Sequence, residues 1–226
     1  MKPIKFFAVA AMLLLSSGAY AQFSNSASSS SSVSSNNEGW STIWVEYNPI
    51  NVKFNKGVDD ESVTGLSFGY SQAFPISSGT PIFIEAGIGV QYAFKSDFWD
   101  EDDLNFSMIS AKVPFNFIYD FAIPNSSVRL DPFVGLTLRY NITAKFSGED
   151  DDDDMNLFDK DDMGSNKNTM NRFQPGWQIG LKARFGNSFM AGVSYGSDFS
   201  TIWEPNMGEK VKANVSTTTL TIGYVF

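Results

Sequence analysis

The sequence predicts an all-β fold, an eight-stranded antiparallel up-and-down transmembrane β-barrel, and three observations support this prediction. Eight segments alternate between large apolar residues and small or polar ones with a period of two, as β-strands do. The connections between these segments are short and long in turn. Aromatic residues gather on the apolar faces near both ends of the segments. A strand with lipid on one side and a narrow polar interior on the other has these properties.

The C-terminal segment, 215–226, shows the alternation most clearly. One face carries the large residues Leu220, Ile222, Tyr224 and Phe226. The other face carries Thr219, Thr221, Gly223 and Val225. Because the large face is also the apolar one, we expect it to meet lipid while the small face lines the interior.

Seven earlier segments alternate in the same way. They span 40–48, 63–74, 82–94, 106–121, 129–142, 175–185 and 189–195. Pro114, in the fourth of them, cannot donate a hydrogen bond to the ladder, so we expect a bulge there. Soluble sandwiches and barrels also alternate, so the pattern alone does not separate them from a membrane barrel.

The connections do separate these classes. Those after the second, fourth and sixth segments are short, at 75–81, 122–128 and 186–188. Those after the first, third, fifth and seventh segments are longer and more polar, and 145–174 is the longest. Membrane barrels have tight periplasmic turns and long outer loops. If the N-terminus is periplasmic, the outward aromatic residues form one belt at each rim.

The N-terminal region predicts export from the cytoplasm. Lys2 and Lys5 precede an apolar run at 6–15, and the small residues around Tyr20 form a cleavage site, so residues 1–21 are a predicted signal peptide. Residues 22–38 are rich in Ser and Asn and predict a disordered leader. We expect residues 39–226 to form the barrel with acidic outer loops.

Composition excludes several classes of function. The chain has no Cys and no His, and His is the commonest general base and metal ligand. We therefore expect no enzymatic activity, no catalytic residues and no tightly bound cofactor. The net charge is −9, and loss of Lys2 and Lys5 makes it −11, so nucleic acid is not an expected partner.

The signal peptide, the eight segments, the Lys-Val-Pro-Phe sequence at 112–115 and the Tyr-Val-Phe sequence at 224–226 resemble the small porin-family outer-membrane β-barrel proteins. These are similar in architecture to OmpA- and OmpX-type barrels. The resemblance implies that Tyr224 and Phe226 belong to an assembly signal in the C-terminal strand, which the barrel-assembly machinery recognises. It implies an architecture and not an activity. The resemblance also implies a location in the outer membrane of a Gram-negative bacterium, where we expect a monomer in contact with lipid and lipopolysaccharide.

Two acidic clusters fall in predicted outer loops, and the larger suggests a metal site. Its candidate ligands are Asp150, Asp151, Asp152, Asp153, Asp154, Asp159, Asp161 and Asp162. Carboxylates at this density suit calcium or magnesium, although the spacing is not that of an EF-hand. A solvated, self-repelling loop, loose divalent-ion binding and a defined ion site all stay open. We expect the loop to bury little of itself.

A separate set of charged residues, both acids and bases, is predicted to face the barrel interior. Its members are Glu46, Glu85, Lys112, Asp120, Arg139, Lys182 and Arg184. Buried charges are costly unless they are paired, and an eight-stranded barrel is just wide enough for side chains to fill it. We expect the two acids Glu85 and Asp120 to face Lys182 and Arg184 near the periplasmic end. One acid, Glu46, is expected near two bases farther out.

Together these patterns predict a structural or surface-interaction role, through adhesion, a ligand or divalent cations, with the lumen plugged by paired charges. A narrow porin-like channel for ions or small solutes is one alternative. An accessory barrel of a secretion or assembly machine is another.

Overall fold

The structure is a computed structural model that describes residues 38–55, 59–77, 79–98, 104–148, 155–162, 169–186, 188–203 and 212–226. The predicted signal peptide lies outside the described residues, as does the predicted leader except for Glu38.

The described residues form one antiparallel sheet that closes into a barrel of eight long strands. These are β1 (Trp40–Phe54), β2 (Glu61–Pro75), β3 (Ile82–Lys95), β4 (Asn105–Tyr119), β6 (Val128–Ser147), β8 (Phe173–Phe185), β9 (Phe189–Asp198) and β10 (Ala213–Val225). Each pairs with its neighbours along the chain, and pairing of β1 with β10 completes the circle. Two short strands, β5 (Phe121–Ala122) and β7 (Met155–Asn156), pair with β6. The predicted fold class is confirmed.

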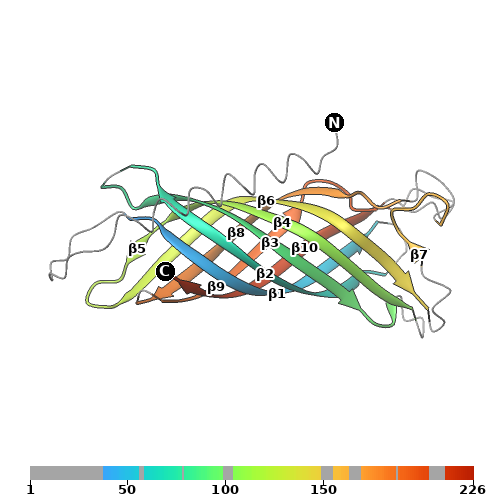
Figure 1. Cartoon of the computed structure of the whole chain (residues 1–226), viewed down its shortest axis with the longest axis horizontal. Coiled ribbons are helices and arrows are strands. Elements are labelled where there is room, and N and C mark those ends of the chain that lie inside the picture. Colours follow the sequence, from blue (N-terminus) through green and yellow to red (C-terminus); the bar gives the residue numbers. More distant parts are fainter. Residues whose placement is uncertain are drawn as a thin grey trace.

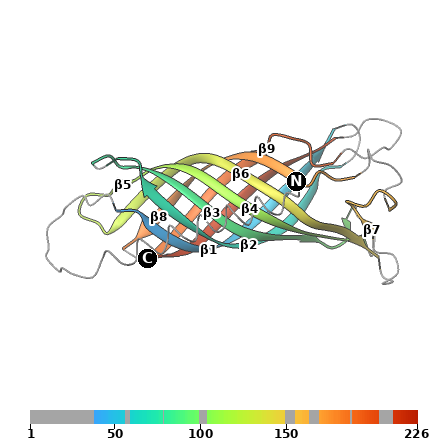
Figure 2. The ribbon, with the colours of Figure 1, turned by 45° about the horizontal axis from the view of Figure 1, so that its top comes forward.

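The barrel has two different ends (Figures 1 and 2). We call one the turn end, because β1 begins and β10 ends there and the connections 76–81 and 186–188 are short. We call the other the loop end, because it carries β7 and the connections 148–172 and 199–212. Both figures place β5 at the turn end and β7 at the loop end.

The connection between β1 and β2 is shorter than we predicted. β1 continues past Asn48 to Phe54, and Pro49 pairs in register with Thr64 of β2. Only residues 55–60 are left between the two strands, as many as in the turn 76–81. The strand continues because its next residues bury Ile50 inside the barrel.

The predicted bulge at Pro114 is wrong, because the irregularity lies elsewhere. Pro114 pairs in register with Thr137, whereas the β4–β6 register shifts between Ile109 and Ser110, where β6 has Ile142 as an extra residue. A Cβ atom on Gly87, in the neighbouring strand, would lie 3.1 Å from Cγ of Pro114. The glycine therefore gives the proline ring room without a bulge.

The barrel exterior is apolar. Phe68, Ile222 and Tyr224 are 61%, 57% and 58% exposed, and patches of this kind mark a surface that meets lipid or another apolar partner. Outward aromatic residues lie toward both ends, including Tyr47, Tyr92, Trp177, Tyr119, Phe185 and Phe189. Among the described residues no helix is long and apolar enough to cross a membrane.

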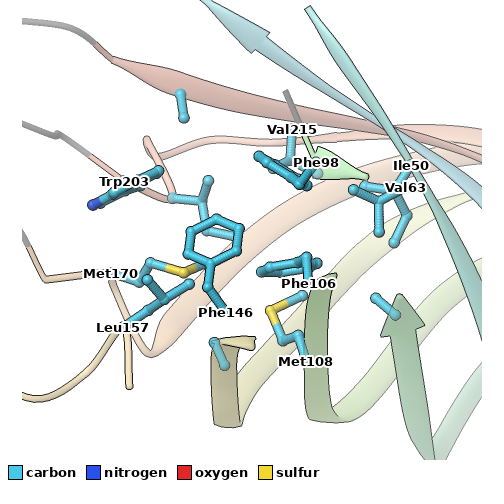
Figure 3. Close-up of a cluster of buried hydrophobic side chains, with 14 residues drawn as sticks. Ile50, Val63, Phe98, Phe106, Met108, Phe146, Leu157, Met170, Trp203 and Val215 are labelled. Carbon is cyan, nitrogen blue, oxygen red and sulfur yellow. The ribbon is translucent and has the colours of Figure 1, made fainter. Parts of the chain in front are cut away.

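The interior changes character along the barrel. Toward the turn end it is crossed by charged and polar side chains, with small apolar groups around Phe83 and Trp44. The loop end is filled by a larger apolar group, which we call the loop-end cluster (Figure 3). It consists of Ile50, Val63, Ala93, Phe98, Phe106, Met108, Ala144, Phe146, Leu157, Met170, Ile202, Trp203, Ala213 and Val215.

Glycines set the width that is left for large inward side chains. Trp44 is 4% exposed and points into the barrel. A Cβ atom would lie 2.3 Å from the Trp44 ring at Gly69 and 2.4 Å from it at Gly89. Contacts this short do not occur in proteins, so the indole fits only because two neighbouring strands carry glycine there.

Candidate functional site

The candidate site is the charged part of the barrel interior. All seven residues that we predicted to face the lumen lie on inner faces, and their side chains are 3–12% exposed. β3, β4, β6 and β8 supply most of them, because successive inward residues on one strand are two apart. The barrel thus projects acids and bases from several strands into an interior just wide enough for side chains to fill it.

Glu85 of β3 lies at the centre of the best-connected group. Its two carboxylate oxygens accept hydrogen bonds from Nζ of Lys182 at 2.7 and 2.5 Å. Oγ of Ser71 donates at 2.8 Å and Nδ2 of Asn116 at 2.7 Å. Gln178 extends the network by donating to Oδ1 of Asn116 at 2.6 Å. A buried carboxylate with this many donors is fully compensated.

A second network closes the turn end. Arg184 donates to both oxygens of Asp131, at 2.6 and 3.0 Å, and lies 3.0 Å from Oδ2 of Asp120. Arg129 binds the same Asp120 from the rim with hydrogen bonds of 2.6–3.0 Å. The Arg184 guanidinium also lies 3.6 Å from the centre of the Trp40 ring, which adds a cation–π contact.

Two further pairs lie nearer the loop end. Nζ of Lys112 donates to Glu46 at 2.6 Å. The guanidinium of Arg139 is paired with Asp198 and lies 3.5 Å from Oε1 of Gln91. The sequence placed one acid beside two bases at this level, whereas the structure gives each base its own acid.

Asp131 and Asp198 are two interior acids that our sequence reasoning missed, and Glu61, which is buried and paired with Lys95, is a third. Asp131 and Asp198 lie at inward-facing positions of their strands, and the side chain of each is buried next to an arginine. Asp131 precedes the inward Gly135 by four residues on β6, so the two residues share the inward face. Asp198 was missed because we ended its strand at Tyr195, whereas β9 continues to Asp198. Extending the alternation in both strands finds these residues.

The ion pairs lie at successive levels along the barrel, and polar space remains between them. A cavity next to Arg139 and Asp198 is lined by polar groups that include Asn48, Gln91 and Thr219. A smaller one lies next to Glu85 and Lys182. Such spaces suit water. A solute moving along the barrel axis would meet one of these acid–base pairs at each level.

The candidate metal ligands are only partly described. Asp150, Asp151, Asp152, Asp153 and Asp154 lie outside the described residues. Oδ2 of Asp162 accepts a hydrogen bond from the Asn156 amide at 2.9 Å, and Oδ1 of Asp159 accepts one from the Asp161 amide at 2.9 Å. Within the described residues, no group of three or more acidic side chains is arranged to hold a metal ion.

The loop that carries these acids buries more of itself than we expected. Leu157 is 1% exposed and belongs to the loop-end cluster. Its amide donates to the Ala144 carbonyl at 2.9 Å, and its carbonyl accepts from the Met170 amide at 2.8 Å. The expectation that this loop buries little is therefore wrong, because it folds back onto the mouth of the barrel.

The proposed assembly signal lies on the barrel exterior. Tyr224 and Phe226 are 58% and 50% exposed, and their rings stack with centroids 6.1 Å apart. The Phe226 backbone exchanges two hydrogen bonds with Ser41, at 2.9 and 3.0 Å. The C-terminal residue is thus fixed to β1 through its backbone while its side chain faces outward.

Comparisons with known proteins identify the family. Residues 18–202 match the family described as "Outer membrane protein beta-barrel domain". A comparison with curated protein sequences gives no match.

Among solved structures the chain is similar to small outer-membrane barrels. The attachment invasion locus protein Ail of Yersinia pestis is 18% identical, with 84% of this chain and 99% of that chain covered and a TM-score of 0.48. Neisserial surface protein A is 18% identical over 82% and 95%, with a TM-score of 0.46. The outer membrane enzyme PagL is 15% identical over 79% and 97%, with a TM-score of 0.43. These similarities concern the fold alone.

Proposed function

The chain belongs to the family of outer membrane protein β-barrel domains, and from that premise we propose that it is a closed, non-conducting barrel of the Gram-negative outer membrane. Its role in this proposal is structural or surface-interacting, and its long loops face the outside of the cell. The lumen serves to hold the barrel rigid. It provides no route for solutes.

The observation that carries the proposal is a series of ion pairs and packed side chains that close the lumen at successive levels along the barrel axis. Arg184 is held by Asp131 and Asp120, and Lys182 is held by Glu85. The pairs of Lys112 and of Arg139 follow, and the loop-end cluster lies beyond them. A selective channel lines its path with one sign of charge. Mixed signs that are hydrogen bonded to each other favour a plug.

Surface interaction is proposed for the outer loops, because they are where the chain departs most from a minimal barrel. The connection 148–172 is the longest between neighbouring barrel strands. The sequence of this connection concentrates carboxylates at 149–154 and 159–162. We propose loose calcium or magnesium binding there, which can bridge to the phosphates of lipopolysaccharide. Lipid around the barrel and the assembly machinery at the C-terminal strand complete the proposed partners, with a monomeric protein.

A non-enzymatic role is part of the same proposal. The chain has no His, and each interior carboxylate of the described site is engaged by a base, including Glu85, which accepts from Ser71 but is held by Lys182. General acid–base chemistry needs a group that is free to exchange a proton with a substrate.

Planar-bilayer recording of the purified full-length mature protein tests the closed lumen. The wild type should show rare, small openings at most. A variant that removes charges at three levels, with Lys112, Arg139 and Lys182 each changed to Ala, should conduct more often. The matched control changes Val134 and Leu136 to Ala, because both face lipid on β6, and it should behave like the wild type.

Steady ion-selective current through the wild type would overturn the proposal and favour the porin-like channel. Affinity purification from native membranes separates the remaining alternative. Recovery of the barrel in a fixed ratio with components of a secretion or assembly machine would show that it is an accessory subunit.

A further inference from the structure

The loop-end cluster encloses a cavity that the proposed surface role does not use. Its walls include Val63, Phe98, Phe106, Met108 and Phe146 (Figure 3). The empty space amounts to about 500 Å³ when the part that opens to solvent is counted. These side chains come from β2, β4, β6 and the connection after β3.

The lining of this cavity is apolar apart from one residue. Arg139 is the one charged side chain among the described residues that line it. Its guanidinium is already paired with Asp198 and directed toward Gln91. A ligand in the cavity therefore meets no uncompensated charge, and a charged or strongly polar ligand would lose its hydration without gaining a partner.

The walls consist of groups that adapt to an apolar guest. The rings of Phe98, Phe106 and Phe146 contact one another with centroids 5.0–5.6 Å apart. Met108 and Met170 contribute flexible thioether side chains, which pack well against aromatic groups and reshape easily. Protein cores normally fill such space with their own side chains. An apolar cavity that is left open excludes water and takes up apolar molecules.

We propose that the loop-end cavity is a binding site for a small uncharged apolar molecule. Part of this space is the open mouth, so the enclosed part is much smaller and the guest must be small. The site lies between the outer loops and the Arg139–Asp198 pair, which forms its floor. Binding there is independent of conductance, since the ion pairs on the turn side stay in place.

Methionine methyl NMR on the full-length mature protein in lipid nanodiscs tests the proposal, with benzene as the probe. Met108 and Met170 line the cavity. Met190 is buried near the turn end and Met155 is 42% exposed outside the cavity. The aromatic ring current should shift the methyl signals of Met108 and Met170 saturably and leave the signals of Met190 and Met155 unchanged.

Two substitutions of one type on the same strand provide the matched comparison. Ala93 is fully buried and lines the cavity, so Ala93→Phe should fill it and weaken benzene binding by about tenfold or more. Ala86 lies on the lipid-facing side of β3, so Ala86→Phe should leave binding unchanged. Sodium benzoate, which has the same ring with a charge, should give no saturable shift.

Three results would overturn the proposal. The first is the absence of any shift in the wild type up to the solubility of benzene. The second is a linear shift of all four methionines, which would mean that benzene only dissolves in the lipid. The third is equal binding to the Ala93→Phe and Ala86→Phe variants. If Ala93→Phe does not fold, the wild-type titration and its two reference methionines decide the question alone.

Discussion

On the turn side of the barrel, inward positions carry charged residues such as Glu85 and Lys182, whereas at the loop end the same kind of position carries Phe106 and Phe146. Both regions are buried and both fill the barrel interior. They are stabilised differently. Each charge needs one particular partner on another strand, while the apolar side chains need only neighbours of suitable size. The turn side is therefore specific, and the loop end is tolerant and able to leave a cavity.

The largest expected effect comes from leaving a charge without its partner on the turn side. Glu85→Ala removes the carboxylate but keeps the Lys182 ammonium in a buried site. We expect a loss of about 3–5 kcal/mol of unfolding free energy. Urea unfolding of the barrel in detergent, followed by the gel shift between folded and heated protein, measures it.

The double variant Glu85→Leu/Lys182→Met serves as the control, because it removes both charges and keeps side chains of similar volume. It should recover most of the lost stability. If the single and double variants are equally destabilised, packing and not charge pairing is the main contribution of Glu85, and the contrast between the two regions fails.

Truncation in the loop-end cluster should cost somewhat less. Phe146 is 6% exposed and contacts Phe98, Phe106 and Trp203. Phe146→Ala should lose about 3 kcal/mol, the low end for a buried Phe, because the neighbouring cavity lets the cluster rearrange. Phe146→Leu should lose only about 1 kcal/mol. A Leu variant as unstable as the Ala variant would contradict the tolerance that we assign to this region.

Two variants in the connection 148–172 test where the loop-end cluster ends. Leu157→Ala should cost about 2 kcal/mol, since this side chain is 1% exposed. Deleting 149–154 should change stability by only a few tenths of a kcal/mol, because loop length affects closure entropy weakly. Thermal melts of both variants test this. A deletion as damaging as Leu157→Ala would extend the cluster into the acidic segment.

A position outside both interior regions should have a smaller effect on stability. Phe226→Ala keeps the backbone bonds to Ser41 and loses a ring that is half exposed. We expect about 1 kcal/mol in detergent. Insertion in cells should suffer more than refolding if the C-terminal strand carries the proposed assembly signal. Equal losses in the two assays would mean that Phe226 contributes through packing alone.

Calcium should have the smallest effect. If the acidic segment binds it loosely, millimolar calcium should raise the melting temperature of the wild type slightly. The variant with Asp150, Asp151, Asp152, Asp153 and Asp154 changed to Asn should show no such rise. The same rise in both proteins would place the effect elsewhere, and none in either would leave the segment as a solvated loop.

The sequence alone was sufficient for the fold class and for most of the inward charges. Alternation is a local property, so β2 and β3 were predicted within two residues of their observed ends. The alternation was least informative at the loop end. There Phe106 and Phe146 point inward although they are as apolar as the lipid-facing residues. The extra residue Ile142 also exchanges the inward and outward positions in the part of β6 that follows it. The alternation therefore could not show which way Phe146 points.

Alternation along the chain specifies strands with one face for lipid and one for a polar interior, because that information repeats every second residue. Which acid meets which base, and how the loop end is closed, depends on the tertiary structure. Glu85 and Lys182 are 97 residues apart, and Arg184 and Asp131 are 53 apart. Those pairings depend on the stagger and closure of the barrel. That geometry is a property of all eight strands together, and no single segment encodes it.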